Sequence, residues 1–139
     1  MKCREVMTEN PICCAAYDSV GQAARVMRRE RVGSIPVVTD DLKKELIGVI
    51  TDRDLAYKVV GESRDAIRTQ VYDVMTAAAV ACRDDDDVIV ALRAMAEHQL
   101  RTIPVMDYSG RLVGVISEGD IAVQVPPSMQ LVRDLGQAA

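Results

Sequence analysis

The sequence predicts a mixed α+β fold, in the broad α/β class, made of two β-α-β-β-α repeats that pack as a pseudo-twofold pair. The first observation behind this prediction is size, because 139 residues with 49% hydrophobic and 27% charged content suit one domain or two very small ones sharing a core. The second is an internal repeat, in which residues 6–38 match residues 74–106 at 12 of 33 positions. The third is the alternation of extended and helical apolar patterns within each copy.

The first repeat begins with a short extended run at residues 12–15. A helix is expected next, because Asp18 and Ser19 offer side-chain oxygens to the amides of a first helical turn. An apolar stripe at helical spacing follows and is formed by Val20, Ala23, Ala24 and Met27. The remaining expected elements are a hairpin of two β-rich runs and a second helix, at residues 35–39, 46–50 and 52–60.

The second repeat has the same order of elements. Its first helix is expected to start at Asp86 and Asp87, and its apolar stripe is formed by Val88, Ala91, Leu92 and Met95. Its strands and second helix are expected at residues 80–82, 103–106, 112–116 and 118–125. The chain therefore divides into repeat 1 with an N-terminal lead (1–60), a linker (61–73), repeat 2 (74–125) and a tail (126–139).

One such repeat would be only marginally stable alone, so we expect the two copies to pack face to face. A strand-helix-strand step favours parallel pairing and a hairpin adds an antiparallel neighbour, so each sheet should be mixed. Gly48 and Gly114, at matching places in the last strands, are expected to allow close approach of another backbone. A pseudo-twofold pair presents each functional element twice, on opposite rims of one central cleft.

The composition argues against several classes of function. A net charge of −4, a pI near 5.0 and the absence of Trp and Phe do not favour nucleic acid or an anionic lipid surface as partner. No apolar run approaches the roughly 18–20 residues that cross a bilayer, and the start of the chain lacks an apolar signal region. We therefore expect a cytoplasmic protein without membrane contact. A single histidine, and no nucleophile beside a base in a recognisable order, argue against an enzyme.

The cysteines predict no metal site. Cys3, Cys13, Cys14 and Cys82 show neither CxxC nor zinc-ligand spacing, and only His98 could add a nitrogen ligand. His98 lies near the end of a predicted helix, where a structural role is expected. Cys14 and Cys82 occupy equivalent positions in the two repeats, which predicts packing. Cys13 would point to the opposite face of its sheet and is a candidate redox thiol.

Three motifs occur in the same order in both repeats. They are Val6-Met7-Thr8 and Val74-Met75-Thr76, then Gly33-Ser34-Ile35-Pro36-Val37 and Arg101-Thr102-Ile103-Pro104-Val105, then Gly48-Val49-Ile50-Thr51-Asp52-Arg53-Asp54 and Gly114-Val115-Ile116-Ser117-Glu118-Gly119-Asp120. With these motifs the chain resembles the cystathionine β-synthase (CBS) domain family over residues 4–125, and in particular the stand-alone CBS pairs, or Bateman modules.

The resemblance implies a regulatory, signal-transducing protein. Such a protein would bind an adenosine-containing ligand, such as AMP, ADP, ATP, NAD or S-adenosylmethionine, in the cleft between the repeats and report energy or metabolite state. The resemblance implies neither catalysis nor a catalytic cofactor, and it implies a homodimer with an unknown downstream protein partner. Exposed helices would leave apolar surface for a twofold partner to cover, and Leu131, Val132 and Leu135 of the tail could form a short helix at that seam.

The resemblance also implies two unequal pockets. One would combine Thr51, Arg53 and Asp54 with Ala79, Val80, Arg101 and Thr102, and the other would combine Ser117 and Asp120 with Pro11, Ile12, Gly33 and Ser34. The main chain at Ile12 and Val80 would contact the adenine edge. The chemistry of the residues agrees, because Asp54 could accept hydrogen bonds from both ribose hydroxyls and the amides of the helix starting at Asp52 could hold phosphate. The two arginines of the first pocket correspond to glycines in the second, so we expect the first to prefer phosphorylated ligands.

Each candidate residue also has a purely structural interpretation. The two aspartates can cap helices, and the hydroxyls of Thr51 and Ser117 can cap strand ends. The two arginines can be solvated or paired with carboxylates at little gain. The acidic run at residues 84–87 is interpreted as a solvated helix cap rather than a cation site. The main functional alternative is a ligand-free protein-interaction scaffold, and a nucleic-acid binder is a weaker one.

Overall fold

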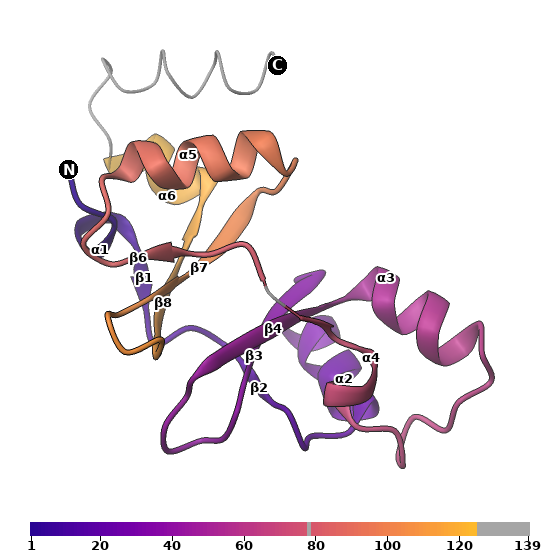
Figure 1. The fold of residues 1–139 in the computed structure, drawn as a ribbon. Coiled ribbons are helices and arrows are strands. Elements are labelled where there is room, and N and C mark those ends of the chain that lie inside the picture. The colour runs from indigo at the N-terminus through magenta and orange to yellow at the C-terminus, as the bar shows by residue number, and fades with distance from the viewer. Residues whose placement is uncertain (78, 125–139) are drawn as a thin grey trace. The chain divides into compact units, whose positions relative to one another are not determined.

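The computed structural model describes residues 1–77 and 79–124, which form two compact units (Figure 1). Unit 1 combines Met1–Pro11 with the chain from Val80 onward, and unit 2 spans Ile12–Ala79. Each unit contains one four-stranded mixed sheet and several helices, so the predicted mixed α+β fold with two repeats is confirmed. The helix expected in the tail, and residue 125 of the second repeat, lie outside the described residues.

Unit 2 carries the first repeat from residue 12 onward, together with two short elements at residues 71–77. In chain order they are β2 (Cys14–Ala15), α2 (Val20–Glu30), β3 (Ser34–Val38), β4 (Leu46–Thr51), α3 (Asp52–Asp54), the π-helix η1 (Leu55–Val60), α4 (Val71–Val74) and β5 (Thr76–Ala77). The strand order is β2-β3-β4-β5, with β2 parallel to β3 and the other two pairs antiparallel. The single helix expected at residues 52–60 is therefore one turn of α-helix continued by a π-helix.

Unit 1 carries the elements of the second repeat. In chain order they are α1 (Cys3–Val6), β1 (Thr8–Glu9), β6 (Cys82–Arg83), α5 (Val88–Glu97), β7 (Thr102–Met106), β8 (Leu112–Ser117) and α6 (Glu118–Gln124). The strand order is β1-β8-β7-β6, with β6 parallel to β7 and the other two pairs antiparallel. Both sheets are mixed, as the strand-helix-strand-hairpin order predicts.

The turn before each long helix uses two neighbouring polar residues for different bonds. The Ser19 hydroxyl accepts a hydrogen bond from the Gln22 amide at 3.1 Å, and the Asp87 carboxylate accepts one from the Ile89 amide at 3.0 Å. The preceding residues, Asp18 and Asp86, each accept a bond at 2.9 Å from the amide three residues earlier and so close the strand-to-helix turn. The predicted helix starts are confirmed.

Each sheet is completed by a segment from the start of the other repeat. Strand β1, from the N-terminal segment of the first repeat, pairs with β8, and β5, from the start of the second repeat, pairs with β4. The short helices of these segments also enter the cores: Val6 lies in the core of unit 1, and Val71 and Val74 lie in the core of unit 2. A sequence repeat and a structural unit are thus different divisions of this chain.

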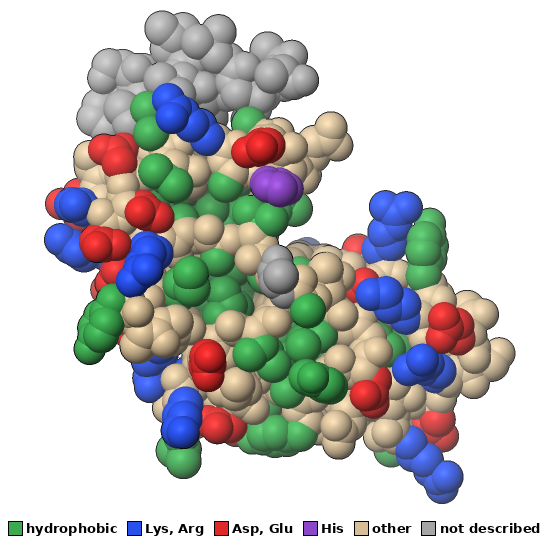
Figure 2. Space-filling view, viewed as in Figure 1, with side chains coloured by type: hydrophobic (Ala, Val, Ile, Leu, Met, Phe, Trp, Pro, Cys, Tyr) green, Lys and Arg blue, Asp and Glu red, His purple; other side chains and the backbone are tan. Residues whose placement is uncertain are grey.

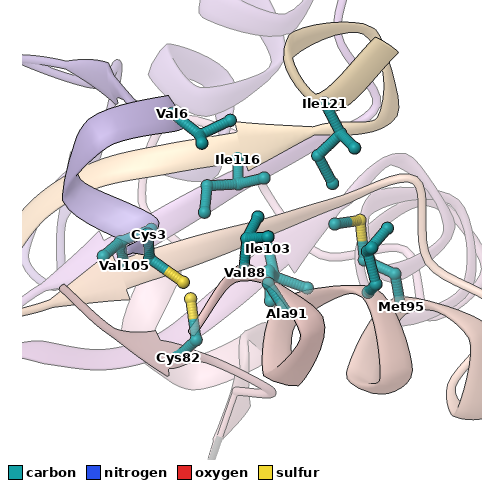
Figure 3. Packing of buried hydrophobic residues seen from close by; sticks show 11 residues of the cluster. Cys3, Val6, Cys82, Val88, Ala91, Met95, Ile103, Val105, Ile116 and Ile121 are labelled. Carbon is teal, nitrogen blue, oxygen red and sulfur yellow. The ribbon is translucent and has the colours of Figure 1, made fainter. Parts of the chain in front are cut away.

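The core of each unit is aliphatic, as the lack of Phe and Trp requires. In unit 1 the buried side chains come from α1, β6, α5, β7, β8 and α6, and Figure 3 shows them packed between the sheet and its helices. They are Cys3, Val6, Cys82, Val88, Ala91, Leu92, Met95, Ile103, Val105, Ile116 and Ile121. Burial of this apolar surface holds the strand ends, which carry the candidate site, in place.

The close backbone approach expected at Gly48 and Gly114 is confirmed. A Cβ at Gly48 would lie 2.6 Å from the carbonyl oxygen of Thr76 in β5. A Cβ at Gly114 would lie 2.5 Å from Sδ of Met7 and 2.9 Å from the carbonyl oxygen of Thr8. We call β1 and β5 the exchanged edge strands, because each comes from the start of the other repeat. Both glycines let the exchanged edge strand come close to its neighbour in the sheet.

We expect Gly114→Ala to lower the free energy of unfolding by about 1–3 kcal/mol, because the added methyl group must displace backbone of β1. Gly119→Ala is the matched control, because its Cβ would meet only Ser117 Oγ at 3.6 Å and α6 should tolerate or favour alanine. Urea unfolding of the two variants measures the difference. Equal stability of the two variants would contradict this account of Gly114.

Candidate functional site

In unit 2 the candidate site lies where β4 ends and α3 begins. The Thr51 hydroxyl accepts a hydrogen bond from the Asp54 amide, and the Asp54 carboxylate accepts one from the Thr51 amide, both at 3.0 Å. The Thr76 hydroxyl, on β5, lies 3.3 and 3.4 Å from the two oxygens of the same carboxylate. Asp54 is 7% exposed and is the buried charged residue of the part of the chain that the structure describes.

Lys58 compensates the charge of this carboxylate. Its Nζ lies 3.0 Å from Oδ1 of Asp54 and donates to the carbonyl oxygen of Val74 at 3.0 Å. The lysine stands in η1, one turn after Asp54, and it joins the helix, the carboxylate and the exchanged segment. Since an unpaired buried carboxylate is costly, this ion pair offsets the cost of burying the Asp54 carboxylate within unit 2.

Unit 1 repeats the arrangement with Ser117 in place of Thr51 and without the lysine. The Ser117 hydroxyl accepts from the Asp120 amide at 3.1 Å, and the Asp120 carboxylate accepts from the Ser117 amide at 3.0 Å. The Thr8 hydroxyl lies 3.3 and 3.4 Å from the carboxylate oxygens of Asp120. In place of the lysine stands Gln124, whose Nε2 donates to the carbonyl oxygen of Val6 at 3.3 Å. Asp120 is half-buried and has no cation within ion-pair distance among residues 1–77 and 79–124.

The starts of β3 and β7 lie beside the ends of β4 and β8 within the same unit. Ser34 is paired with Thr51, and the amide of Asp52 donates to the carbonyl oxygen of Gly33 at 2.9 Å. In unit 1 the corresponding contacts join Thr102 to Ser117 and the amide of Glu118 to the carbonyl oxygen of Arg101, at 3.0 Å.

The two pockets expected from the sequence would each combine residues of both units, unlike these contacts within one unit. The first would combine Thr51 and Asp54 of unit 2 with Arg101 and Thr102 of unit 1. The second would combine Ser117 and Asp120 of unit 1 with Gly33 and Ser34 of unit 2. This grouping stays a prediction. Within each unit, the structure pairs the start of one strand with the end of the next, where Thr51 or Ser117 lies.

The residues expected to contact adenine lie where the chain passes from one unit to the other. Pro11 ends the N-terminal part of unit 1 and Ile12 begins unit 2, while Ala79 ends unit 2 and Val80 resumes unit 1. None of the four lies in a strand, because β2 and β6 begin later than the expected extended runs. Ile12 is 41% exposed, whereas Val80 packs against the core of unit 1. Their role in adenine recognition stays a prediction.

Arg53 is exposed and lies over an aromatic ring. Its guanidinium carbon is 5.0 Å from the centroid of the Tyr57 ring, one turn further along the helix. Such a cation–π contact is worth about 0.5–1 kcal/mol at an exposed site and limits the freedom of the guanidinium. The sequence interpretation of Arg53 as either a phosphate ligand or a solvated residue did not include this contact.

The structural interpretation of the two aspartates is confirmed, since both close a hydrogen-bonded ring with the residue that ends the strand. Their capping role leaves further acceptor capacity, because an ionised carboxylate has about four lone-pair sites. Two pairs of site residues were missed by sequence reasoning: Thr8 with Thr76, and Lys58 with Gln124. The alignment of the two repeats could have indicated these residues, because each pair occupies matching positions in it.

The acidic run at residues 84–87 is part of a helix start, as expected. Asp87 caps α5 and lies 3.8 Å from the N-terminal ammonium group, and Asp86 closes the turn.

Within the described residues no group of three or more His, Cys, Asp or Glu side chains is placed to hold a metal ion. None of the described helices is long and apolar enough to span a membrane. His98 is the C-cap residue of α5, in agreement with its expected place at a helix end.

The thiols of unit 2 are poorly suited to form thiolates. Burial raises the pKa of Cys14 to about 12, and burial also raises the pKa of the half-buried Cys13. The packing role expected for Cys14 agrees with its place in the core. The raised pKa of Cys13 does not favour the redox role considered for it, since the thiolate is the reactive form.

Comparisons with known proteins identify the family. The family model described as CBS domain matches residues 3–61 and 71–126. This chain belongs to the CBS domain family. The two matches correspond to the two repeats, and the structural neighbours are stand-alone CBS-domain pairs, so the chain has the organisation of a Bateman module. Stand-alone CBS pairs are generally regulatory rather than catalytic.

Several relatives cover nearly the whole CBS pair. The uncharacterized protein YlbB of Bacillus subtilis is 35% identical over 122 residues, which are 88% of this chain and 80% of YlbB. The crystal structure of Hypoxic Response Protein I with two coordinated zinc ions has a TM-score of 0.80 and 29% identity, covering 91% of this chain and 100% of that one. The crystal structure of CBSX2 in complex with AMP has a TM-score of 0.73 and 25% identity, covering 94% and 97% of the two chains.

We expect Lys58→Met to lower the free energy of unfolding by about 1–2 kcal/mol, because it leaves the buried Asp54 carboxylate without a cation. The lysine side chain is 43% exposed, so solvent screens part of the loss. Urea unfolding of Lys58→Met, Asp54→Asn and the double variant forms a double-mutant cycle, in which a coupling energy of about 1 kcal/mol is expected. Gln124→Met is the matched control, because it removes no contact to a carboxylate. Additive effects in the cycle would contradict the ion pair.

Proposed function

We propose that this CBS pair is a regulatory protein that binds adenosine-containing nucleotides through Asp54 and Asp120. The observation that carries the proposal is the repeated arrangement of a strand-end hydroxyl, a carboxylate and an exchanged threonine in both units. A carboxylate can accept hydrogen bonds from two neighbouring hydroxyl groups, which a ribose provides. The AMP complex of the similar protein CBSX2 supports the choice of ligand class.

Ligand binding at these carboxylates would replace weak contacts with stronger ones. The threonine hydroxyls lie 3.3–3.4 Å from the carboxylate oxygens, at the long end of hydrogen bonding. Hydroxyl donors to carboxylates typically approach to about 2.5–2.7 Å, so a ribose hydroxyl could displace Thr8 or Thr76 with a net gain. The bonds from the strand-end amides can remain, because they use other lone pairs.

The main alternative is a ligand-free scaffold for protein partners. It is supported by Asp54, whose oxygens already contact an amide, a threonine and Lys58 and which is 7% exposed. A nucleic-acid binder has less support, because acidic and basic side chains are interspersed on the face shown in Figure 2. A homodimer, an energy-sensing role and a cytoplasmic location remain part of the proposal, and exposed Val60 and Ile67 offer apolar surface for a second copy.

Isothermal titration calorimetry with AMP, ATP and adenosine tests the proposal. We expect binding by the unmodified protein, and a loss of about 1.5–3 kcal/mol at one site in Asp54→Asn and at the other in Asp120→Asn. Asp85→Asn, on the exposed acidic run, is the control and should bind as the unmodified protein does. Absence of binding by the unmodified protein would favour the scaffold, and binding unaffected by either site variant would remove the two aspartates from the site.

We further propose that the site of unit 2 prefers phosphorylated nucleotides. Three of five matched positions differ in charge: unit 2 has Gly33, Asp52, Arg53, Asp54 and Lys58, whereas unit 1 has Arg101, Glu118, Gly119, Asp120 and Gln124. The first set is neutral and the second has one excess negative charge. The lysine also contacts the carboxylate directly, so an approaching phosphate meets a compensated charge in unit 2.

Exchange of the matched residues tests this preference. We expect Lys58→Gln to lower the ratio of AMP to adenosine affinity at the Asp54 site by about 3- to 10-fold, since one charge a few ångströms away is worth about 1 kcal/mol in water. Gln124→Lys should raise the same ratio at the Asp120 site. Titrations in the Asp120→Asn and Asp54→Asn backgrounds assign each effect to its site. An unchanged ratio in both variants would contradict the role of Lys58.

A further inference from the structure

Two cysteines from distant parts of the sequence meet in the core of unit 1. Cys3 lies in α1 and Cys82 lies in β6, with 0% and 2% of their surfaces exposed. Figure 3 shows their sulfur atoms pointing toward one another across the gap between the two elements. Both residues belong to the same core cluster, so their arrangement is a property of unit 1 alone.

Backbone hydrogen bonds hold both residues in place. The amides of Cys3 and Arg4 donate to the carbonyl oxygens of Asp86 and Asp84, at 2.9 and 3.0 Å. Cys82 is held in the parallel ladder opposite Val105. Helix α1 is therefore hydrogen-bonded to the turn that follows β6, and these backbone bonds hold the two thiols facing each other.

The two thiols are chemically unequal. A hydrogen bond from the Cys82 thiol lowers the pKa of Cys3, while burial and the nearby carboxylates of Asp86, Asp87 and Asp84 oppose this effect. The same hydrogen bond, followed by burial, raises the pKa of Cys82. These directions favour Cys3 as the attacking cysteine of the pair and Cys82 as the resolving one.

Unit 2 shows that packing does not require the second thiol. Cys14 matches Cys82 in the repeat, but the residue that matches Cys3 is Val71, which is also fully buried. An aliphatic side chain of similar size therefore satisfies this position of the core. The presence of two facing thiols in unit 1, and of one in unit 2, distinguishes the two units.

We propose that Cys3 and Cys82 form a redox modification site, in which a peroxide converts the two thiols into an intramolecular disulfide bond. In the first step the Cys3 thiolate attacks one oxygen of hydrogen peroxide and the O–O bond breaks. The leaving hydroxide takes up the proton that Cys3 released, giving one water and a sulfenic acid on Cys3. The Cys82 sulfur then attacks the Cys3 sulfur, the S–O bond breaks, and the departing hydroxide takes the Cys82 proton as a second water. Two thiols lose two electrons, and one peroxide gains them.

The disulfide would fix the segment that supplies Thr8 to the candidate site. Helix α1 ends at Val6, and Thr8 follows after one residue, with its hydroxyl on the Asp120 carboxylate. A covalent bond from Cys3 to β6 ties this segment to the sheet. Its effect on nucleotide binding rests on the proposed function, whereas formation of the bond does not.

Thiol counting in a Cys13→Ser background tests the proposal, because that change removes the half-buried thiol and leaves three. After treatment with hydrogen peroxide and removal of the excess, titration in denaturant should find one free thiol, and a thiol reductant should restore three. Cys3→Val copies Val71 of unit 2 and should keep both of its remaining thiols. Cys14→Val should lose both of its remaining thiols. Peptide mapping should identify a Cys3–Cys82 link.

Two further measurements follow the segment itself. The oxidised protein should show slower hydrogen exchange at the amides of Cys3 and Arg4 and a melting temperature higher by about 5 °C or more, since the bond closes a long loop. Retention of all three thiols under peroxide, a link through Cys14, or irreversible oxidation would overturn the proposal. These results do not depend on nucleotide, so they are separate from failure of the proposed function.

Discussion

The aliphatic core of each unit includes side chains from the segment that opens the other repeat. A repeat of about 60 residues buries little apolar surface and would be only marginally stable alone. Val71 and Val74 complete the core of unit 2, and Cys3 and Val6 complete that of unit 1. The same segments supply the edge strands and place a threonine hydroxyl on each carboxylate. The same two exchanged segments therefore complete the cores and determine the geometry of the candidate sites.

The two sites share a backbone arrangement and differ in electrostatics. Each carboxylate is held by the amide of a strand-end residue, so its position is set by main-chain geometry that both repeats preserve. The residue one turn later decides the charge, with Lys58 on the carboxylate in unit 2 and Gln124 on a carbonyl group in unit 1. The duplication thus preserves the backbone around each carboxylate, while side chains beside it differ in charge between the units.

Much of the fold was predictable because a duplication tests every local interpretation twice. The helix starts at Ser19 and Asp87, the hairpins and the role of Gly48 followed from residue chemistry at matched positions. The exchange of edge strands was not predictable, since local patterns do not say which sheet a short segment joins. The contact between Lys58 and Asp54 was not predicted, because the i,i+4 spacing alone does not show that the Asp54 carboxylate is buried. The grouping of site residues from both units depends on long-range placement, which no local pattern fixes.

The exchange of edge strands also orders the assembly of the chain in time. During synthesis from the N-terminus, residues 12–79 are complete before the strand β8 exists, so unit 2 can close first. The segment with β1 is made earliest but has its partner at Val115, more than 100 residues later. Contacts between residues so far apart in sequence form slowly. Strand β1 is thus synthesised first but is among the last elements to pair with its sheet.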